Sequence, residues 1–233
     1  MSATMGWVWF VLAGYLAGSV PFGLLAGLTK GVDLRKVGSR NIGASNAGRV
    51  LGRPWFFIVL ALDALKGFLP VLLVGLWLDR SGVFAAEDRM IWDQLARLAV
   101  AMAAILGHLF PVFLGFRGGR GVATSLGAVL AIWPYYTISG LLAFGVWGAV
   151  KKATGYISIA SIVACGSFPA LVILVGAVAG ESLVSLTPLI IFAGIVAGLV
   201  VIRHWPNIQR LRAGQELSPD HVADTAGGPA EHE

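Results

Sequence analysis

The stretch "YISIASIVACGSFPALVILVGAVAGESLVSLTPLIIFAGIVAGLVVI" runs from position 156 to position 202 and contains a single charged residue, Glu181. A helix needs about 20 apolar residues to cross the hydrocarbon core of a bilayer. The stretch contains two such runs, at 156–179 and 184–202, separated by a short polar turn at 180–183. It therefore predicts two consecutive membrane-spanning helices and, with them, an all-α membrane protein.

The composition extends this prediction to the whole chain. Of its 233 residues 57% are hydrophobic and 12% are charged, whereas about a quarter of the residues of a soluble domain are charged. The first apolar run has no basic segment before it and is too long for a cleavable signal peptide, so we interpret it as a span. Further spans are predicted near 5–28, 55–78, 94–114, 121–133 and 135–150.

The fourth and fifth of these spans meet at Trp133-Pro134. Proline removes a backbone donor and clashes with the preceding turn of a helix. This favours two short helices over 121–150, although one long kinked helix is also compatible with the sequence.

The loops predict the orientation, because cytoplasmic loops of membrane proteins are rich in Lys and Arg. The connections at 79–93 and 180–183 carry most of the acidic residues outside the tail. Cations gather in the other connections and after the last span: Lys30, Arg35, Lys36, Arg40, Arg49 and Arg53; Arg117 and Arg120; Lys151 and Lys152; Arg203, Arg210 and Arg212. We therefore expect seven spans, with the N-terminus outside and the C-terminus in the cytoplasm. Five spans with a re-entrant 121–150 is the alternative.

We expect residues 1–216 to form a single membrane-embedded domain. The stretch 217–233 is polar and without periodicity, which predicts a disordered cytoplasmic tail. Cys165 is the only cysteine, so no intramolecular disulfide can form, and the four histidines form no recognisable metal-binding motif. We therefore expect neither a metal nor a cofactor, and nothing in the sequence indicates nucleic acid as a partner.

Three polar segments all fall on the predicted cytoplasmic side. In "GFRGGRG" at 115–121, glycines surround Arg117 and Arg120, and an apolar helix is predicted to follow. Glycine permits close approach of the backbone, successive N–H groups can form an anion nest, and a helix N-terminus favours negative charge. We expect this loop to bind phosphate, rather than to be only a basic loop.

The segment "GSRNIGASNAGR" at 38–49 has similar chemistry, with Ser39, Asn41, Ser45, Asn46 and Arg49. By itself it is equally compatible with an ordinary loop. The third segment places His204, Asn207 and Arg210 on one helix face. By itself it is better explained by contact with anionic lipid headgroups.

Three ionisable residues lie inside predicted spans. Asp63 and Lys66 are spaced to pair on one helix face, and ions within a membrane are generally paired or functional. A structural ion pair and a role at the site are equally compatible with the pattern. His108 stands shortly before the glycine-rich loop, where a packed histidine is the more common situation.

Together these segments resemble the bacterial acyl-phosphate:glycerol-3-phosphate acyltransferases, the PlsY family. The family patterns GSGNxGATNxxR, GHxFPxFxxFKGGKGVAT and HxxNIxRLxxGxE are matched at 38–49, by "GHLFPVFLGFRGGRGVAT" at 107–124 and by "HWPNIQRLRAGQE" at 204–216. "GSVPFG" at 18–23 and "LDALKG" at 62–67 also fit. The departures are mild: Arg40, Ser45, Arg117, Arg120 and Trp205 replace residues more common in the family.

The resemblance implies a seven-helix enzyme of the bacterial inner membrane with its active site at the cytoplasmic face. It implies transfer of an acyl group from acyl phosphate to the 1-hydroxyl of glycerol 3-phosphate, giving lysophosphatidic acid and phosphate. It also leaves room for functional coupling to a soluble enzyme that produces acyl phosphate.

The same resemblance implies roles for individual residues. Ser39 and Arg49 would be the essential pair of the first motif, and His204 and Asn207 would contribute to activity. Asn41, Ser45, Asn46, Arg117, Gly118, Gly119, Arg120 and Gly121 would bind substrate phosphate. Glu216 would be structural, and Asp63, Lys66 and His108 would support the structure or the site.

The physical chemistry agrees with this function. Both substrates carry phosphate, which accounts for two cationic glycine-rich segments. Phosphate is a good leaving group, so orientation and charge stabilisation can supply most of the catalysis. Whether His204 or a substrate phosphate accepts the hydroxyl proton cannot be read from the sequence. The His-x-x-x-x-Asp acyltransferase signature and the aspartate-rich motif of CDP-alcohol phosphotransferases are both missing, and a transporter for a phosphorylated small molecule is the alternative from another class.

Overall fold

The computed structural model describes residues 6–84 and 89–216, and these are helical with connecting loops. The predicted tail at 217–233 therefore lies outside the described residues. The helices are α1 (Gly6–Ser19), α2 (Phe22–Leu28), α3 (Ala44–Leu51), α4 (Arg53–Ser81), α5 (Arg89–Leu109), the 3₁₀ helix η2 (Val112–Leu114), α6 (Val122–Leu130), α7 (Tyr135–Thr154), α8 (Ile157–Val178), α9 (Leu183–Arg203) and α10 (Trp205–Arg212).

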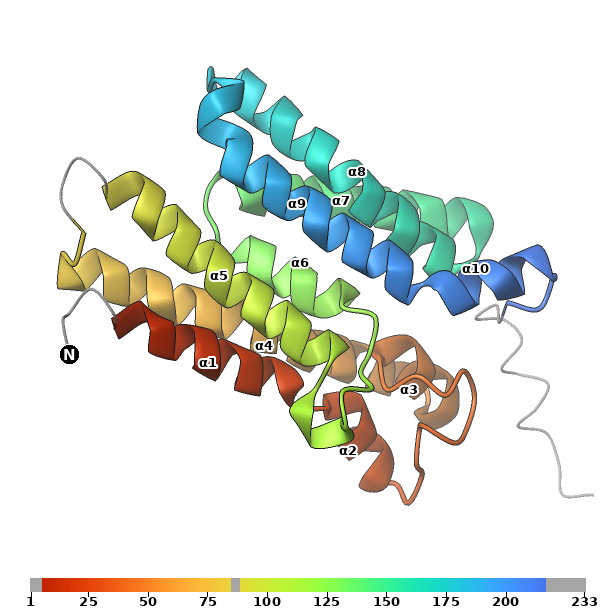
Figure 1. Ribbon diagram of the computed structural model, residues 1–233. Coiled ribbons are helices and arrows are strands. Elements are labelled where there is room, and N and C mark those ends of the chain that lie inside the picture. The colour runs from red at the N-terminus through yellow and green to blue at the C-terminus, as the bar shows by residue number, and fades with distance from the viewer. Residues whose placement is uncertain (1–5, 85–88, 217–233) are drawn as a thin grey trace, which may run out of the picture.

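The long helices pack in two groups (Figure 1). α1, α4 and α5 lie side by side, α7, α8 and α9 form the other group, and α6 lies between them. The protein is a multi-pass membrane protein. In the described residues, five segments are long and apolar enough to cross a membrane: Gly6–Leu28, Arg53–Ser81, Arg89–Leu114, Ile157–Val178 and Leu183–Arg203.

The predicted break at Pro134 is present, because α6 ends at Leu130 and α7 begins at Tyr135. α6 has 9 residues, and at about 1.5 Å per residue it is too short to cross the hydrocarbon core by itself. α7 has 20 residues, and in Figure 1 it returns toward the end of the bundle where α6 starts. The count of seven spans stays a prediction.

The first predicted span contains a break that the apolar pattern did not indicate. α1 ends at Ser19, and α2 begins at Phe22, directly after Pro21. The backbone carbonyl of Val20 accepts a hydrogen bond of 2.8 Å from Lys66 Nζ. The same carbonyl also accepts from the N–H of Phe22 at 3.2 Å, so Lys66 adds a second, charged donor to the backbone at this break and stabilises it.

Glycines allow the helices around α6 to approach closely. A Cβ atom at Gly67 would lie 2.1 Å from the carbonyl oxygen of Thr124, and one at Gly127 would lie 1.8 Å from that of Ala64. Small residues permit such close backbone contact between membrane helices. α6 is thus held against α4, and this contact determines where the glycine-rich loop before α6 can lie.

Candidate active site

The three polar segments predicted on one side gather at one end of the bundle. Figure 1 shows the α2–α3 region, the loop that precedes α6 and helix α10 at the same end, away from the N-terminus. These segments are far apart in the sequence, so only the packing of the long helices brings them together.

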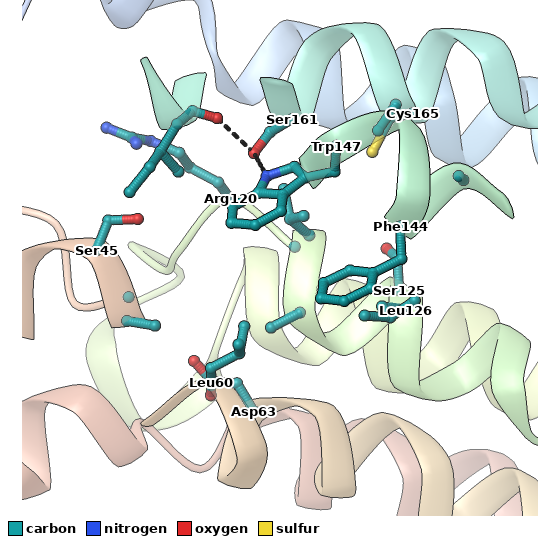
Figure 2. Close-up of a pocket in the computed structure, with 18 of the residues that line it drawn as sticks. Ser45, Leu60, Asp63, Arg120, Ser125, Leu126, Phe144, Trp147, Ser161 and Cys165 are labelled. Carbon is teal, nitrogen blue, oxygen red and sulfur yellow. Dashed lines mark hydrogen bonds between the residues drawn. The ribbon is translucent and has the colours of Figure 1, made fainter. Parts of the chain in front are cut away.

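A cavity of about 140 Å³ begins among these segments and extends between α4, α7 and α8 (Figure 2). Its polar wall is formed by residues of the three motifs: Asn41, Gly43, Ser45, Arg120, Gly121 and His204. Its apolar wall includes Phe56 and Leu60 from one side and Phe144, Trp147, Ala164, Cys165 and Phe168 from the other. One cavity therefore joins a polar cationic region to a long apolar region.

Two helix N-termini face the polar wall. Gly43, Ala44 and Ser45 at the start of α3, and Gly121, Val122 and Ala123 at the start of α6, line the cavity. The first N–H groups of a helix have no acceptor within the helix, and the helix dipole places partial positive charge there. Gly121 has φ +88°, a conformation that favours glycine, which lets the loop turn sharply into α6. Both ends suit anionic groups such as phosphate.

Asn46 organises the loop that leads into α3. Its Oδ1 accepts a hydrogen bond from the N–H of Ser39, and its Nδ2 donates to the carbonyls of Leu34 and Val37, at 2.9, 3.1 and 3.1 Å. The side chain is 1% exposed and does not line the cavity. The structure thus contradicts the prediction that Asn46 binds phosphate, because its polar atoms already bind the loop.

The glycine-rich loop packs against the end of α5. The N–H of Gly118 donates to the carbonyl of Leu109, and the N–H of Gly119 donates to the carbonyl of His108. A Cβ atom at Gly119 would lie 2.2 Å from His108 Nε2, and one at Gly118 would lie 2.1 Å from the His108 carbonyl oxygen. The N–H groups of these two glycines are therefore already used and do not contribute to the predicted anion nest, and the small size of both residues serves packing.

Arg203 holds the same loop from the other side. Its Nε and Nη2 donate to the carbonyls of Gly119 and Gly118, at 3.1 and 2.8 Å. The sequence interpretation treated Arg203 only as a cytoplasmic cation and missed this contact. Its position directly before His204 was the one available signal.

The two arginines of the loop are placed differently. Arg117 is exposed and does not line the cavity, so the structure does not support its predicted contact with substrate phosphate. Arg120 lines the cavity. Burial lowers the pKa of Arg120 to about 10, an effect that Glu216 opposes and that Arg210, Arg49 and Arg203 reinforce. The charges that act on Arg120 are thus three arginines and one carboxylate, so this cluster has an excess of positive charge.

Glu216 ties the end of the chain to α10. It accepts hydrogen bonds from Asn207 Nδ2 and from Arg210 Nε, the latter at 2.9 Å. Burial alone would raise the pKa of Glu216, but these hydrogen bonds hold it below the usual value. Burial lowers the pKa of Arg49, and the charge of Glu216 opposes that shift. The contacts agree with a structural role for Glu216.

His204 lines the cavity and is 1% exposed. Its Nδ1 lies 2.8 Å from the carbonyl oxygen of Val200. Because a carbonyl can only accept, Nδ1 carries the proton and Nε2 is left as the acceptor. Burial, reinforced by the charge of Arg120, lowers the pKa of His204 to about 4, so the ring is neutral at pH 7.

Asp63 and His108 lie in the cavity wall, and both are almost fully buried. Lys66 Nζ lies 2.7 Å from Asp63 Oδ1, which confirms the predicted pair. His108 Nδ1 lies 3.7 Å from the same oxygen, too far for a hydrogen bond. The pair is therefore both structural and adjacent to the site.

Comparison with known proteins decides the family. A family model for glycerol-3-phosphate acyltransferase matches residues 8–214. The chain belongs to the glycerol-3-phosphate acyltransferase family, the PlsY family.

Individual relatives agree with this assignment. The acyltransferase of Desulfotalea psychrophila is 41% identical over 90% of this chain and 96% of its own length. That of Aquifex aeolicus is 38% identical over 90% and 97%. The glycerol 3-phosphate form of PlsY, an integral membrane glycerol 3-phosphate acyltransferase, superimposes with a TM-score of 0.74 at 36% identity, over 91% of this chain and 94% of that one.

The residues of the acyltransferase motifs form two groups, those that line the cavity and those that do not. Asn41, Ser45, Arg120, Gly121 and His204 line the cavity directly. Ser39, Arg49 and Asn207 do not: the N–H of Ser39 is bound by Asn46, and Asn207 binds Glu216. The apolar wall of the acyltransferase cavity was not predicted residue by residue, because apolar residues in a membrane helix carry no signal that separates a cavity from a lipid-facing surface.

Proposed function

We propose that this protein is a membrane enzyme that moves a fatty acyl group from acyl phosphate to the 1-hydroxyl of sn-glycerol 3-phosphate. The products are lysophosphatidic acid and phosphate, and the reaction is the first acylation of phospholipid biosynthesis. The observation that carries the proposal is the continuous cavity, which offers Arg120 and two helix N-termini to phosphate groups and an apolar wall to an acyl chain.

The polar wall suits two phosphorylated substrates. We assign one phosphate to the start of α6 with Arg120, and the other to the start of α3 with Asn41 and Ser45. Arg49, Arg203 and Arg210 add positive charge behind Arg120. Such preorganised charge supports the transfer, because negative charge moves onto the departing phosphate as the acyl carbonyl is attacked.

The acceptor hydroxyl must be oriented and must lose a proton. His204 presents a neutral ring whose Nε2 can accept a hydrogen bond from that hydroxyl. With a pKa of about 4, His204 is a weak base, so a substrate phosphate is the alternative proton acceptor. Both assignments place His204 next to the reacting hydroxyl, where it orients the nucleophile.

The relatives named as glycerol-3-phosphate acyltransferases support the acceptor. A solved PlsY structure in a lysophosphatidic acid form supports the product, and it is 34% identical to this chain over 94% of its length. The gathering of the basic loops at one end of the bundle supports an active site at the cytoplasmic face of the inner membrane. A soluble enzyme that produces acyl phosphate would then have direct access to the end of the cavity where the phosphate of the donor binds.

The decisive experiment uses purified protein in detergent. It should release phosphate and form lysophosphatidic acid from palmitoyl phosphate and glycerol 3-phosphate, and it should not use palmitoyl-CoA. Turnover without a sealed membrane compartment would also exclude a pure transporter. Equal or better activity with the CoA donor would contradict the assignment of acyl phosphate.

A further inference from the structure

An aromatic cluster closes the deep end of the cavity. Phe168 lines the cavity, and its ring centroid lies 5.3 Å from that of Tyr136, which in turn lies 5.8 Å from that of Phe192. Tyr136 is fully buried, and its hydroxyl donates to the carbonyl of Leu189. The three rings come from α7, α8 and α9, so the wall is held by three helices at once.

The depth of the cavity can be read along α8. Lining residues of this helix run from Ile157, near the polar wall, to Phe168. These positions are separated by eleven residues, which corresponds to about 16 Å of helix. The hydrocarbon core of a bilayer is about 30 Å thick and holds two layers of acyl chains, so one chain covers about 15 Å. The cavity is as deep as one leaflet.

The lining of the cavity reaches the surface of the bundle on the side of α7. Phe144 on α7 and Leu60 on α4 lie on opposite sides of the cavity (Figure 2), and Phe144 is 45% exposed. Side chains exposed at this depth face acyl chains of the membrane. A lipid-like donor can therefore enter sideways, with its phosphate at the polar wall and its chain pointing toward Phe168.

We propose that the Tyr136–Phe168–Phe192 cluster sets the longest acyl chain that this enzyme transfers, and that this limit matches the chains of the surrounding bilayer. The inference rests on the proposed function. A chain that extends beyond Phe168 would have to displace a ring fixed by its neighbours. A methylene that does not fit an apolar site changes specificity by about tenfold or more.

The test measures kcat/KM over a series of donors: lauroyl, myristoyl, palmitoyl and stearoyl phosphate. Phe168→Ala removes the ring at the deep end and should raise the ratio of stearoyl to myristoyl activity by about tenfold. Ala164→Leu narrows the cavity before its end and should lower that ratio by a similar factor. Ala170→Leu is the matched control, because Ala170 lies on the same helix with an exposed side chain and should leave the ratio unchanged.

A second experiment measures chemical labelling of the unaltered protein, so it depends neither on enzyme activity nor on the folding of a variant. Cys165, the only cysteine, lines the cavity (Figure 2). Palmitoyl lysophosphatidic acid should protect it from N-ethylmaleimide in the unaltered protein, whereas a butyryl analogue should not. Equal protection by both analogues would contradict the placement of the chain.

The outcomes separate the two proposals. If the unaltered protein transfers no acyl group from acyl phosphate, the proposed function fails. If it does so, and both Phe168→Ala and Ala164→Leu keep the original chain-length profile, only the role of the aromatic cluster is wrong. If Phe168→Ala does not fold, the profile of Ala164→Leu and the protection of Cys165 decide.

Discussion

Asn46 and Asn41 lie in the same loop and carry the same side chain, yet their contacts differ. Asn46 is buried and holds three backbone groups, whereas Asn41 lines the cavity and accepts a hydrogen bond of 3.3 Å from the N–H of Gly43. In the motif both looked like phosphate ligands. Burial and contact geometry distinguish a residue that builds the loop from one that faces the substrate.

Asn46→Ala should therefore destabilise the protein, by about 1–3 kcal/mol, because buried backbone groups lose their partners. Thermal unfolding in detergent should show a clear drop in Tm. Asn41→Ala should leave the Tm nearly unchanged and raise the KM for a phosphorylated substrate. The same Tm loss in both variants would contradict this separation.

His204 makes stability depend on pH. Its pKa is about 4 in the folded protein and about 6.5 when unfolded. Between these values the unfolded chain binds more protons, so stability falls as the pH falls. From pH 7 to pH 5 the loss should be about 2 kcal/mol.

Denaturation at several pH values checks this, with His204→Gln as the control. This range stays above the window in which Glu216, whose folded pKa is depressed, becomes protonated. The variant should be less sensitive to pH between 7 and 5. An unchanged pH dependence in His204→Gln would show that His204 is not the group responsible.

At the scale of elements, the glycine-rich loop acts as a packed unit. It is bound to α5 through two backbone hydrogen bonds and to the end of α9 through Arg203. These contacts present Arg120 and the start of α6 to the cavity. The loop is thus fixed between two helices by hydrogen bonds and is not free to wrap around a phosphate group.

Gly119→Ala should push the loop away from His108 and raise the KM for glycerol 3-phosphate by about tenfold, or ~1.4 kcal/mol, with a smaller effect on kcat. The three atoms nearest to the new methyl group all belong to the His108 ring. Adding His108→Ala should therefore recover part of the loss, a coupling that a double-mutant cycle measures. Strictly additive effects would argue against the steric explanation.

At the scale of the whole molecule, the distribution of charge predicts how the bundle sits in the membrane. Lys36 is exposed at the end of the bundle where the three polar segments gather. Ser81 is exposed at the C-terminus of α4. The acidic connection that follows α4 includes Glu87, which lies outside the described residues. The basic end should face the cytoplasm.

In a Cys165→Ala background, an impermeant maleimide should label Lys36→Cys only from the cytoplasmic side and Ser81→Cys only from outside. Inverted vesicles and intact spheroplasts provide the two sides. Labelling of both positions from the same side would contradict the crossing of the membrane by α4 and the predicted orientation.

The sequence by itself determined that this is an all-α, multi-pass membrane protein and which motifs belong to the site, and it favoured a break between two helices at Pro134, which the structure confirms. These features depend on local apolar runs, on proline chemistry and on short patterns of residues. The Asp63–Lys66 pair could also be predicted from the sequence, because the two residues are spaced to lie on one helix face.

Only the tertiary structure decided that the first span breaks at Pro21 and that Lys66 donates to the Val20 carbonyl at this break. It also decided that Gly118, Gly119 and Asn46 serve packing, and that Arg203 contacts the glycine-rich loop. It also decided which apolar residues form a cavity closed by Tyr136, Phe168 and Phe192. Each depends on what a residue meets from a distant segment. In a membrane helix, where apolar side chains face lipid and neighbours alike, the local pattern does not distinguish the two.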